Sequence, residues 1–205
     1  MDTCLNMNTV PYNAQIGAGS LLITESRKVA ELILKGATDA DWQRFINVDN
    51  ELQKRSPSSS KRQTRLLRNR LEPAPRELLQ IVVSGTAESS NQALLAAAIE
   101  HSRLLGDFMN QVIREHLRNF EPCLSSGDWC KFLADCEQHE PAVGFWAEST
   151  KKKLGQVVIR ILAEAKYLAN TSTMRITPVS VIPEVQRCLE QHDKHYALHC
   201  MTLIS

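Results

Sequence analysis

Four cationic side chains recur at helical spacing in the middle of the first half of the chain: Lys61, Arg62, Arg65 and Arg68. At 100 degrees per residue, Arg65 and Arg68 lie within about 40 degrees of Lys61, and Leu67 and Leu71 lie on a separate face. Guanidinium groups make fork-shaped contacts with phosphate oxygens or guanine edges. One side of this helix can therefore pack on the protein while the other meets a nucleic-acid backbone.

The charge of the chain is sorted along the sequence although its net value is only +1. Residues 54–76 contain eight basic residues and one acid, Glu72, whereas residues 77–149 contain four basic and eleven acidic residues. A high density of charges of the same sign in one segment is unfavourable unless an anion or an acidic surface compensates it. We expect a polyanion; the alternative is that the basic helix pairs with the acidic middle of the same protein.

The candidate DNA-binding residues fall in two segments. Serine hydroxyls and free amides at the start of the first basic helix would point their dipole at an anion. A second patch of three lysines follows Ser149 and Thr150, where a helix dipole disfavours cations unless an anion is shared; the alternative is three solvated lysines. The candidate set is Ser58, Ser59, Ser60, Lys61, Arg62, Arg65, Arg68, Asn69, Lys151, Lys152 and Lys153.

Other patterns that could do chemistry are weaker. On one continuous helix, Cys188, His192, His195 and His199 would share a face, but ligands stacked along one helix rarely close a tetrahedral zinc site. Residues 17–20 read Gly-Ala-Gly-Ser without the Gly-Lys-Ser of a phosphate loop, so they indicate a tight turn. No nucleophile has a recognisable base. We predict no metal, no cofactor, no small-molecule substrate and no enzymatic activity.

The elements that must position these residues are predicted to be helices. The apolar periodicity predicts helices over 25–35, 39–54, 59–71, 76–84, 128–138, 154–168 and 183–189, and a long one over 89–120 that Gly106 can interrupt. Pro57 separates the second and third helices in the layout of a helix-turn-helix, and residues 174–182 look extended. The fold class is mainly α: a helix-turn-helix-like half over 1–85 and a helical bundle over 86–205, compact, with at most one small β-hairpin.

Composition fits an ordinary globular chain of 205 residues with 43% hydrophobic residues. The six cysteines are scattered and no signal peptide opens the chain, so we expect reduced thiols and a cytoplasmic location. The longest uncharged run, residues 3–24, contains asparagines, a proline and a glutamine. Hydrocarbon would not tolerate these, so we expect no membrane insertion.

Three segments resemble the BrxA family of BREX phage-defence systems. They are residues 12–19 leading into 25–30, the basic stretch 58–71, and residues 98–109, which read AIEHSRLLGDFM. The length matches as well, so the resemblance covers nearly the whole chain. It implies an all-helical, DNA-binding accessory factor encoded beside a methyltransferase, a large ATPase and a phosphatase-like protein.

The residues and the resemblance together predict a non-enzymatic accessory protein that binds double-stranded DNA mainly through phosphate contacts. Its expected partners are duplex DNA and other BREX proteins. Two alternatives stay open: a protein–protein interaction module of the defence complex, and an RNA-binding helical protein.

Overall fold

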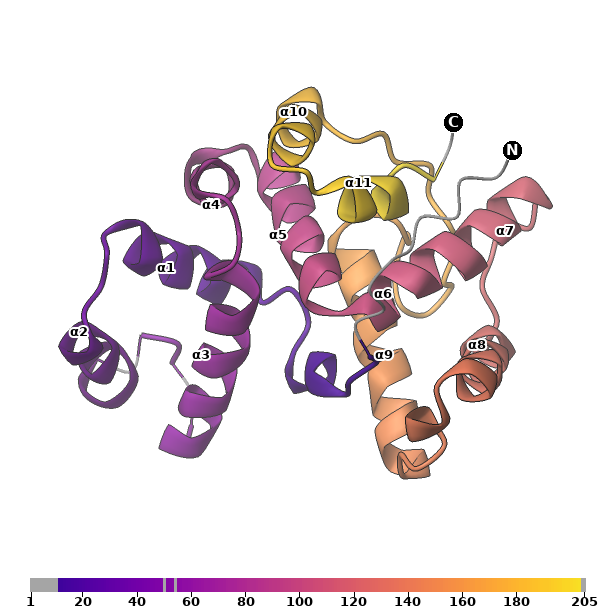
Figure 1. Cartoon of the computed structure of the whole chain (residues 1–205), viewed down its shortest axis with the longest axis horizontal. Helices are drawn as coiled ribbons and strands as arrows, with labels where there is room; N and C mark the ends of the chain where they lie inside the picture. Colours follow the sequence, from indigo (N-terminus) through magenta and orange to yellow (C-terminus); the bar gives the residue numbers. More distant parts are fainter. Residues whose placement is uncertain (1–10, 50, 54, 204–205) are drawn as a thin grey trace.

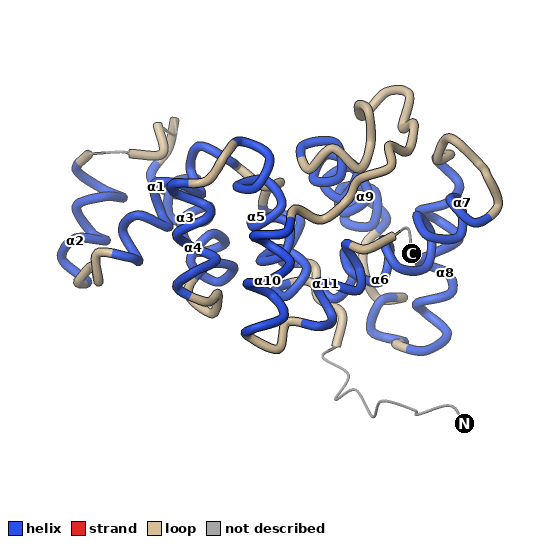
Figure 2. Tube along the Cα trace, turned by 90° about the horizontal axis from the view of Figure 1, so that it is seen from above, coloured by secondary structure: helices blue, strands red, loops and turns tan. Residues whose placement is uncertain are grey.

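The computed structural model describes residues 11–49, 51–53 and 55–203, and it confirms a mainly α, compact fold (Figures 1 and 2). The described part contains no strand. Isolated bridges join Cys123 to Arg175 and Leu168 to Ile176, so two residues of the segment predicted to be extended each form a bridge. The elements in chain order are η1 (Gln15–Ala18), α1 (Ile23–Leu34), α2 (Asp39–Gln43), η2 (Arg44–Val48), α3 (Pro57–Leu71), α4 (Arg76–Ser84), α5 (Ala87–His101), α6 (Arg103–Phe108), η3 (Met109–Ile113), α7 (Arg114–Arg118), α8 (Ser126–His139), η4 (Pro141–Val143), α9 (Glu148–Glu164), α10 (Pro183–Gln191) and α11 (His195–Met201).

The second predicted helix is shorter than the sequence pattern suggested. Thr38 caps α2 in a reciprocal capping box with Asp41, as the hydroxyl before the acidic turn indicated. The helix then widens into the π-helical η2 and ends at Val48. The prediction that it continues to residue 54 was wrong, because the chain turns back and the Glu51 amide donates to the Phe45 carbonyl; residue 54 itself lies outside the described residues.

The basic helix α3 begins two residues earlier than predicted. Ser56 is its N-cap and accepts a hydrogen bond from the Ser59 amide at 3.2 Å, and Pro57 occupies the first helical position. The cap therefore precedes the serines of residues 58–60. Residues 49–56 separate η2 from α3, a longer connection than the three or four residues of a helix-turn-helix.

The long predicted helix over 89–120 is broken at Ser102 instead of Gly106. Gly106 stays helical and lies under the Tyr196 side chain, where a Cβ would clash with the Tyr196 hydroxyl. Thr86 caps α5, and α4 ends at Ser84 before Gly85 as predicted. The glycine in the long stretch thus serves a close contact and leaves the helix intact.

The C-terminal residues form two helices where one was predicted. Helix α10 ends at Gln191 and α11 begins at His195, so the four candidate zinc ligands do not share one continuous helix. Among the described residues, no cluster of histidine, cysteine and acidic side chains could hold a metal ion.

Helix α5 lies at the centre of the molecule, between α1–α4 on one side and α6–α9 on the other (Figure 1). Every residue from 92 to 99 is buried, since small alanines let neighbouring helices approach from all directions. The buried apolar side chains form one connected cluster from Ile16 to Leu203. Within the described part of the chain, no helix is both long and apolar enough to cross a bilayer.

Candidate nucleic-acid interface

The exposed face of α3 carries cations that the protein does not neutralise. Lys61, Arg62 and Arg65 are exposed, and none of them forms an ion pair within the described residues. Arg68 is half-buried: its Nε donates to Glu72 Oε1 at 2.5 Å and its guanidinium lies 4.4 Å from the centre of the Trp42 ring. Three of the four predicted cations are thus free to meet an external anion.

The polar candidates on α3 divide between surface and core. Ser58 and Asn69 are exposed and Ser59 is partly exposed, whereas Ser60 is 1% exposed and faces the core. We therefore do not include Ser60 in the nucleic-acid interface.

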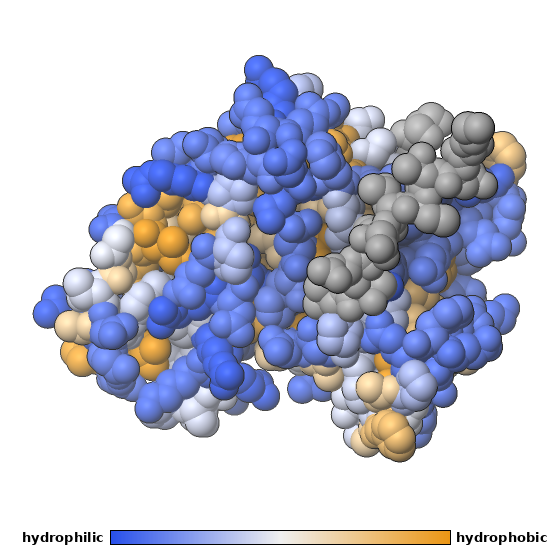
Figure 3. All heavy atoms as spheres, viewed as in Figure 1, coloured by the Kyte–Doolittle hydropathy of each residue, from blue (hydrophilic) through white to orange (hydrophobic). Residues whose placement is uncertain are grey.

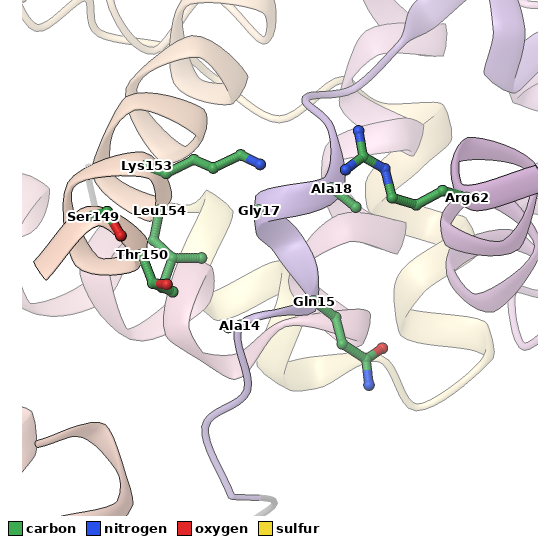
Figure 4. Close-up of a pocket in the computed structure, with 9 residues that line it drawn as sticks. All are labelled: Ala14, Gln15, Gly17, Ala18, Arg62, Ser149, Thr150, Lys153 and Leu154. Carbon is green, nitrogen blue, oxygen red and sulfur yellow. The ribbon is translucent and has the colours of Figure 1, made fainter. Parts of the chain in front are cut away.

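The three consecutive lysines of α9 point in different directions. Lys151 Nζ donates to Glu137 Oε1 at 2.6 Å and lies 3.2 Å from Glu148 Oε1, and the hydrogen bond with Glu137 raises the Lys151 pKa. Lys152 lines a groove between α8 and α9. Lys153 extends towards η1 (Figure 4). Because successive residues of a helix lie 100 degrees apart, the three lysines do not share one surface: Lys151 and Lys152 line the groove, and Lys153 lines a cleft beside η1.

Arg62 and Lys153 meet at one cleft, although 90 residues of sequence separate them. The cleft has a volume of about 380 Å³ and lies between α3, η1 and the start of α9. Figure 4 shows the two side chains extending towards Gly17 and Ala18 from opposite sides. The space-filling view has a hollow at its lower edge between the two lobes of the molecule (Figure 3). Gln15, Ser149 and Thr150 complete the polar lining.

Two glycines allow η1 and the turn after it to lie this close to both basic helices. A Cβ on Gly17 would lie 3.2 Å from a Leu154 methyl of α9. A Cβ on Gly19 would lie 3.2 Å from a Leu66 methyl of α3 and 2.8 Å from Leu22. The glycine-rich stretch 17–20 is thus the spacer that fixes how far apart α3 and α9 stand.

A buried arginine of the basic block holds this spacer from the α3 side. Arg70 is 5% exposed and donates to the carbonyls of Ser20 at 2.5 Å and Gly19 at 2.9 Å. Burial lowers the Arg70 pKa to about 10, an effect that the nearby Glu164 carboxylate opposes. The sequence contained a signal for this position, since Arg70 lies roughly 180 degrees around the helix from Lys61.

Glu164, near the end of α9, holds the same turn from the other side. Its carboxylate accepts hydrogen bonds from the Ser20 hydroxyl and the Leu21 amide, both at 2.8 Å. The chain before η1 is anchored as well, because the Tyr12 hydroxyl donates to Asp107 and its amide to Glu140, both at 2.6 Å. Burial and the contact with Asp107 raise the Tyr12 pKa, so this hydroxyl remains a donor at physiological pH.

Comparisons with known proteins agree with one another. The sequence model of the BrxA family matches residues 10–193. A relative from Paramagnetospirillum magneticum named "BREX protein BrxA" is 42% identical over 190 residues, 93% of this chain and 96% of the relative. A protein of the same name from Escherichia coli O9:H4 is 29% identical over 173 residues, 84% of this chain and 81% of the relative.

A solved structure shares the fold as well. The crystal structure of an uncharacterized protein from Magnetospirillum magneticum superposes with a TM-score of 0.88 at 40% sequence identity, covering 95% of this chain and 100% of the other. A fold match of this quality and a family match over most of the sequence lead to one conclusion. The chain belongs to the BrxA family.

Proposed function

We propose that this protein is a cytoplasmic, non-enzymatic accessory factor of a BREX phage-defence system that binds double-stranded DNA. The observation that carries the proposal is the convergence of unpaired cations from two helices on one cleft. Arg62 of α3 and Lys153 of α9 line the cleft from opposite sides of η1 (Figure 4), and Lys61 and Arg65 are further exposed cations of α3. Exposed cations from two helices on either side of one cleft suit contacts with the phosphates of a duplex.

The start of α9 supports an anion at the same cleft. Ala147 occupies the N-cap position and its side chain cannot cap the helix. The Thr150 amide donates to the Ala147 carbonyl at 2.8 Å, and the Glu148 and Ser149 amides before it have no side-chain cap. The side chains of Ser149 and Thr150 line the cleft beside these amides. Hydroxyls and amides of this kind bind phosphate oxygens without reading the base sequence. We therefore expect weak sequence preference.

The defence role rests on the family. The relatives in Paramagnetospirillum magneticum and Escherichia coli are both named BREX proteins. We infer that this chain likewise works beside other BREX proteins, which supply the catalytic steps. In this arrangement α3 takes the part that the second helix plays in a helix-turn-helix, despite the longer connection before it.

The proposal is tested by a gel shift with duplex DNA. Changing Lys61, Arg62 and Arg65 together to Ala removes three exposed cations of α3, and DNA retention should fall while the helical content measured by circular dichroism stays constant. The matched control changes Lys166, Arg175 and Arg187 to Ala, which removes the same charge from exposed positions elsewhere. Equal retention by both triple variants would show that the interface lies on another surface.

Competition at matched salt tests the choice of nucleic acid. If duplex DNA is the ligand, unlabelled duplex DNA should displace the probe at lower concentration than a hairpin RNA of equal length. If the RNA displaced the probe at lower concentration, the ligand would be a structured RNA and not duplex DNA.

A further inference from the structure

A second and larger hollow lies on the other side of α9, between α8 and α9. Its volume is about 1030 Å³, and one face of each helix lines it over nearly the whole length of α8. On α8 the lining recurs at helical spacing through Ser126, Cys130 and Ala134; on α9 it recurs through Lys152, Gln156 and Arg160. Two helices therefore form the walls of this groove, and a third helix could pack between them.

The floor of the groove is apolar and closed. Trp129 lies at the bottom, where its Nε1 donates to the Lys151 carbonyl at 2.9 Å and its ring packs on Gly155 of α9. Leu133, Ile159 and Met174 add apolar surface beside it. Two phenylalanines, Phe120 in the loop before α8 and Phe145 between η4 and α9, are 93% and 88% exposed, but neither of them lines the groove.

The dimensions of the groove select a helical occupant. The α8 wall from Ser126 to Glu137 is about 17 Å long, which is the length of a helix of three turns. The small side chains of Ser126, Cys130 and Ala134 let a third helix axis approach α8 closely. An apolar stripe at helical spacing would then cover Trp129 and Leu133, in the manner of an amphipathic helix in a hydrophobic groove.

The charges on the rim of the groove indicate which charges a bound helix should carry. Lys152 and Arg160 are exposed and form no ion pair within the described residues, and they stand about 12 Å apart along α9. The two acids of the lining, Glu137 and Glu148, are both engaged by Lys151, at 2.6 Å and 3.2 Å. The groove therefore offers two unpaired cations, and carboxylates on the occupant would pair with them.

We propose that the α8–α9 groove binds an amphipathic helix of a partner protein that carries acidic residues along one flank. The apolar face of that helix packs on Trp129, Leu133 and Ile159, and its carboxylates pair with Lys152 and Arg160. The groove adjoins the DNA cleft at Ser149, which lines both, but the cations of the two sites differ: Lys153 faces η1, whereas Lys152 faces the groove. One helix, α9, then contacts nucleic acid on one flank and a protein on the other.

The test measures binding of a designed helical peptide by fluorescence anisotropy. The probe is a labelled amphipathic helix of about 14 residues with leucines on one face and glutamates on one flank; a second peptide has lysines in place of the glutamates. The glutamate peptide should bind the wild-type protein at least about tenfold more tightly than the lysine peptide.

Two variants and a control locate the binding site. Cys130→Trp fills the exposed groove wall, and the pair Lys152→Glu with Arg160→Glu reverses the rim charge without changing the packing. The first should weaken binding about tenfold or more, and the second should reverse the preference between the peptides. Gln138→Trp adds the same bulk to an exposed α8 position outside the groove and should bind as wild type does.

The remaining outcomes are decisive as well. Equal binding of the two peptides, or unchanged binding by Cys130→Trp, overturns the proposal. A wild-type dimer in sedimentation that Cys130→Trp converts to a monomer would assign the groove to a second copy of this chain and overturn it too. Cys130→Trp should retain duplex DNA if α3 and Lys153 form the nucleic-acid interface, so failure of one proposal is separable from failure of the other.

Discussion

Arg70 and Glu164 hold the same turn from opposite sides, one from α3 and the other from α9. Arg70 donates to the Ser20 carbonyl at 2.5 Å, and Glu164 accepts from the Ser20 hydroxyl at 2.8 Å. The two charged groups therefore tie two helices to one spacer. The position of Arg62 relative to Lys153 depends on this tie, although neither Arg70 nor Glu164 faces the cleft.

Glu164→Ala should weaken both the fold and the interface. The change removes two hydrogen bonds and leaves the buried Arg70 charge without its nearby carboxylate, so we expect a loss of about 2 kcal/mol in the free energy of unfolding, measured with urea. Duplex affinity should fall several-fold, since the spacer no longer fixes the cleft. Glu164→Gln keeps one side-chain oxygen as an acceptor, so its free energy of unfolding and its duplex affinity should lie between those of the wild type and Glu164→Ala. Wild-type duplex affinity in a folded Glu164→Ala protein would contradict the role given to the turn.

Gly155→Ala should destabilise the protein despite the better helix propensity of alanine. A Cβ at Gly155 would lie 2.7 Å from the Trp129 ring, which is fixed by its hydrogen bond to Lys151. We expect a net loss of about 1–2 kcal/mol in urea unfolding, because the clash exceeds the gain of about 1 kcal/mol in propensity.

Gly127→Ala is the matched control for this substitution. A Cβ at Gly127 would lie 3.5 Å from the Ser125 hydroxyl, an ordinary contact. This variant should be as stable as wild type or slightly more stable. If the two alanine variants had the same stability, Trp129 would not pack on α9 as described.

The free energy of unfolding should fall at acidic pH because the unfolded chain takes up a proton at His101. Burial and the nearby Arg70 charge lower the His101 pKa from 6.5 to about 4, so the unfolded chain binds this proton more readily than the folded one. The contribution of the neutral imidazole is fully present above pH 6.5 and is lost as the pH falls towards 4. We expect the stability difference between wild type and His101→Gln to shrink over this window in urea titrations. A difference that stays constant with pH would mean that the imidazole titrates normally.

The sequence predicted the elements whose formation depends on local signals. Apolar residues at helical spacing and the Gly85 that follows them predicted α4, and its observed bounds equal the predicted ones. The exposed face of α3 was predictable because charge density and helical geometry lie within one segment. Gly106 was misread, since a glycine kept for contact with Tyr196 looks in sequence like a helix breaker.

The cleft itself could not be predicted from local patterns. Arg62 and Lys153 come together only because η1 packs on Leu154 and Leu66 at once, and such a contact depends on the packing of distant segments. The three lysines looked like one patch in the sequence, but the helix turns them towards an ion pair, a groove and a cleft. Which side chains of α9 face η1 and which face α8 therefore depends on tertiary packing.

The most direct test of the interface is the salt dependence of duplex DNA binding. If about four to six phosphates are neutralised, the slope of log affinity against log salt should be roughly −4 to −5 for the wild-type protein. Replacing Arg62, Arg65 and Lys153 together by Ala should reduce the magnitude of this slope by about 2 to 3, because cations of both helices release counterions from the same duplex. An unchanged slope in that variant would contradict the account, since these side chains would then not contact DNA phosphates.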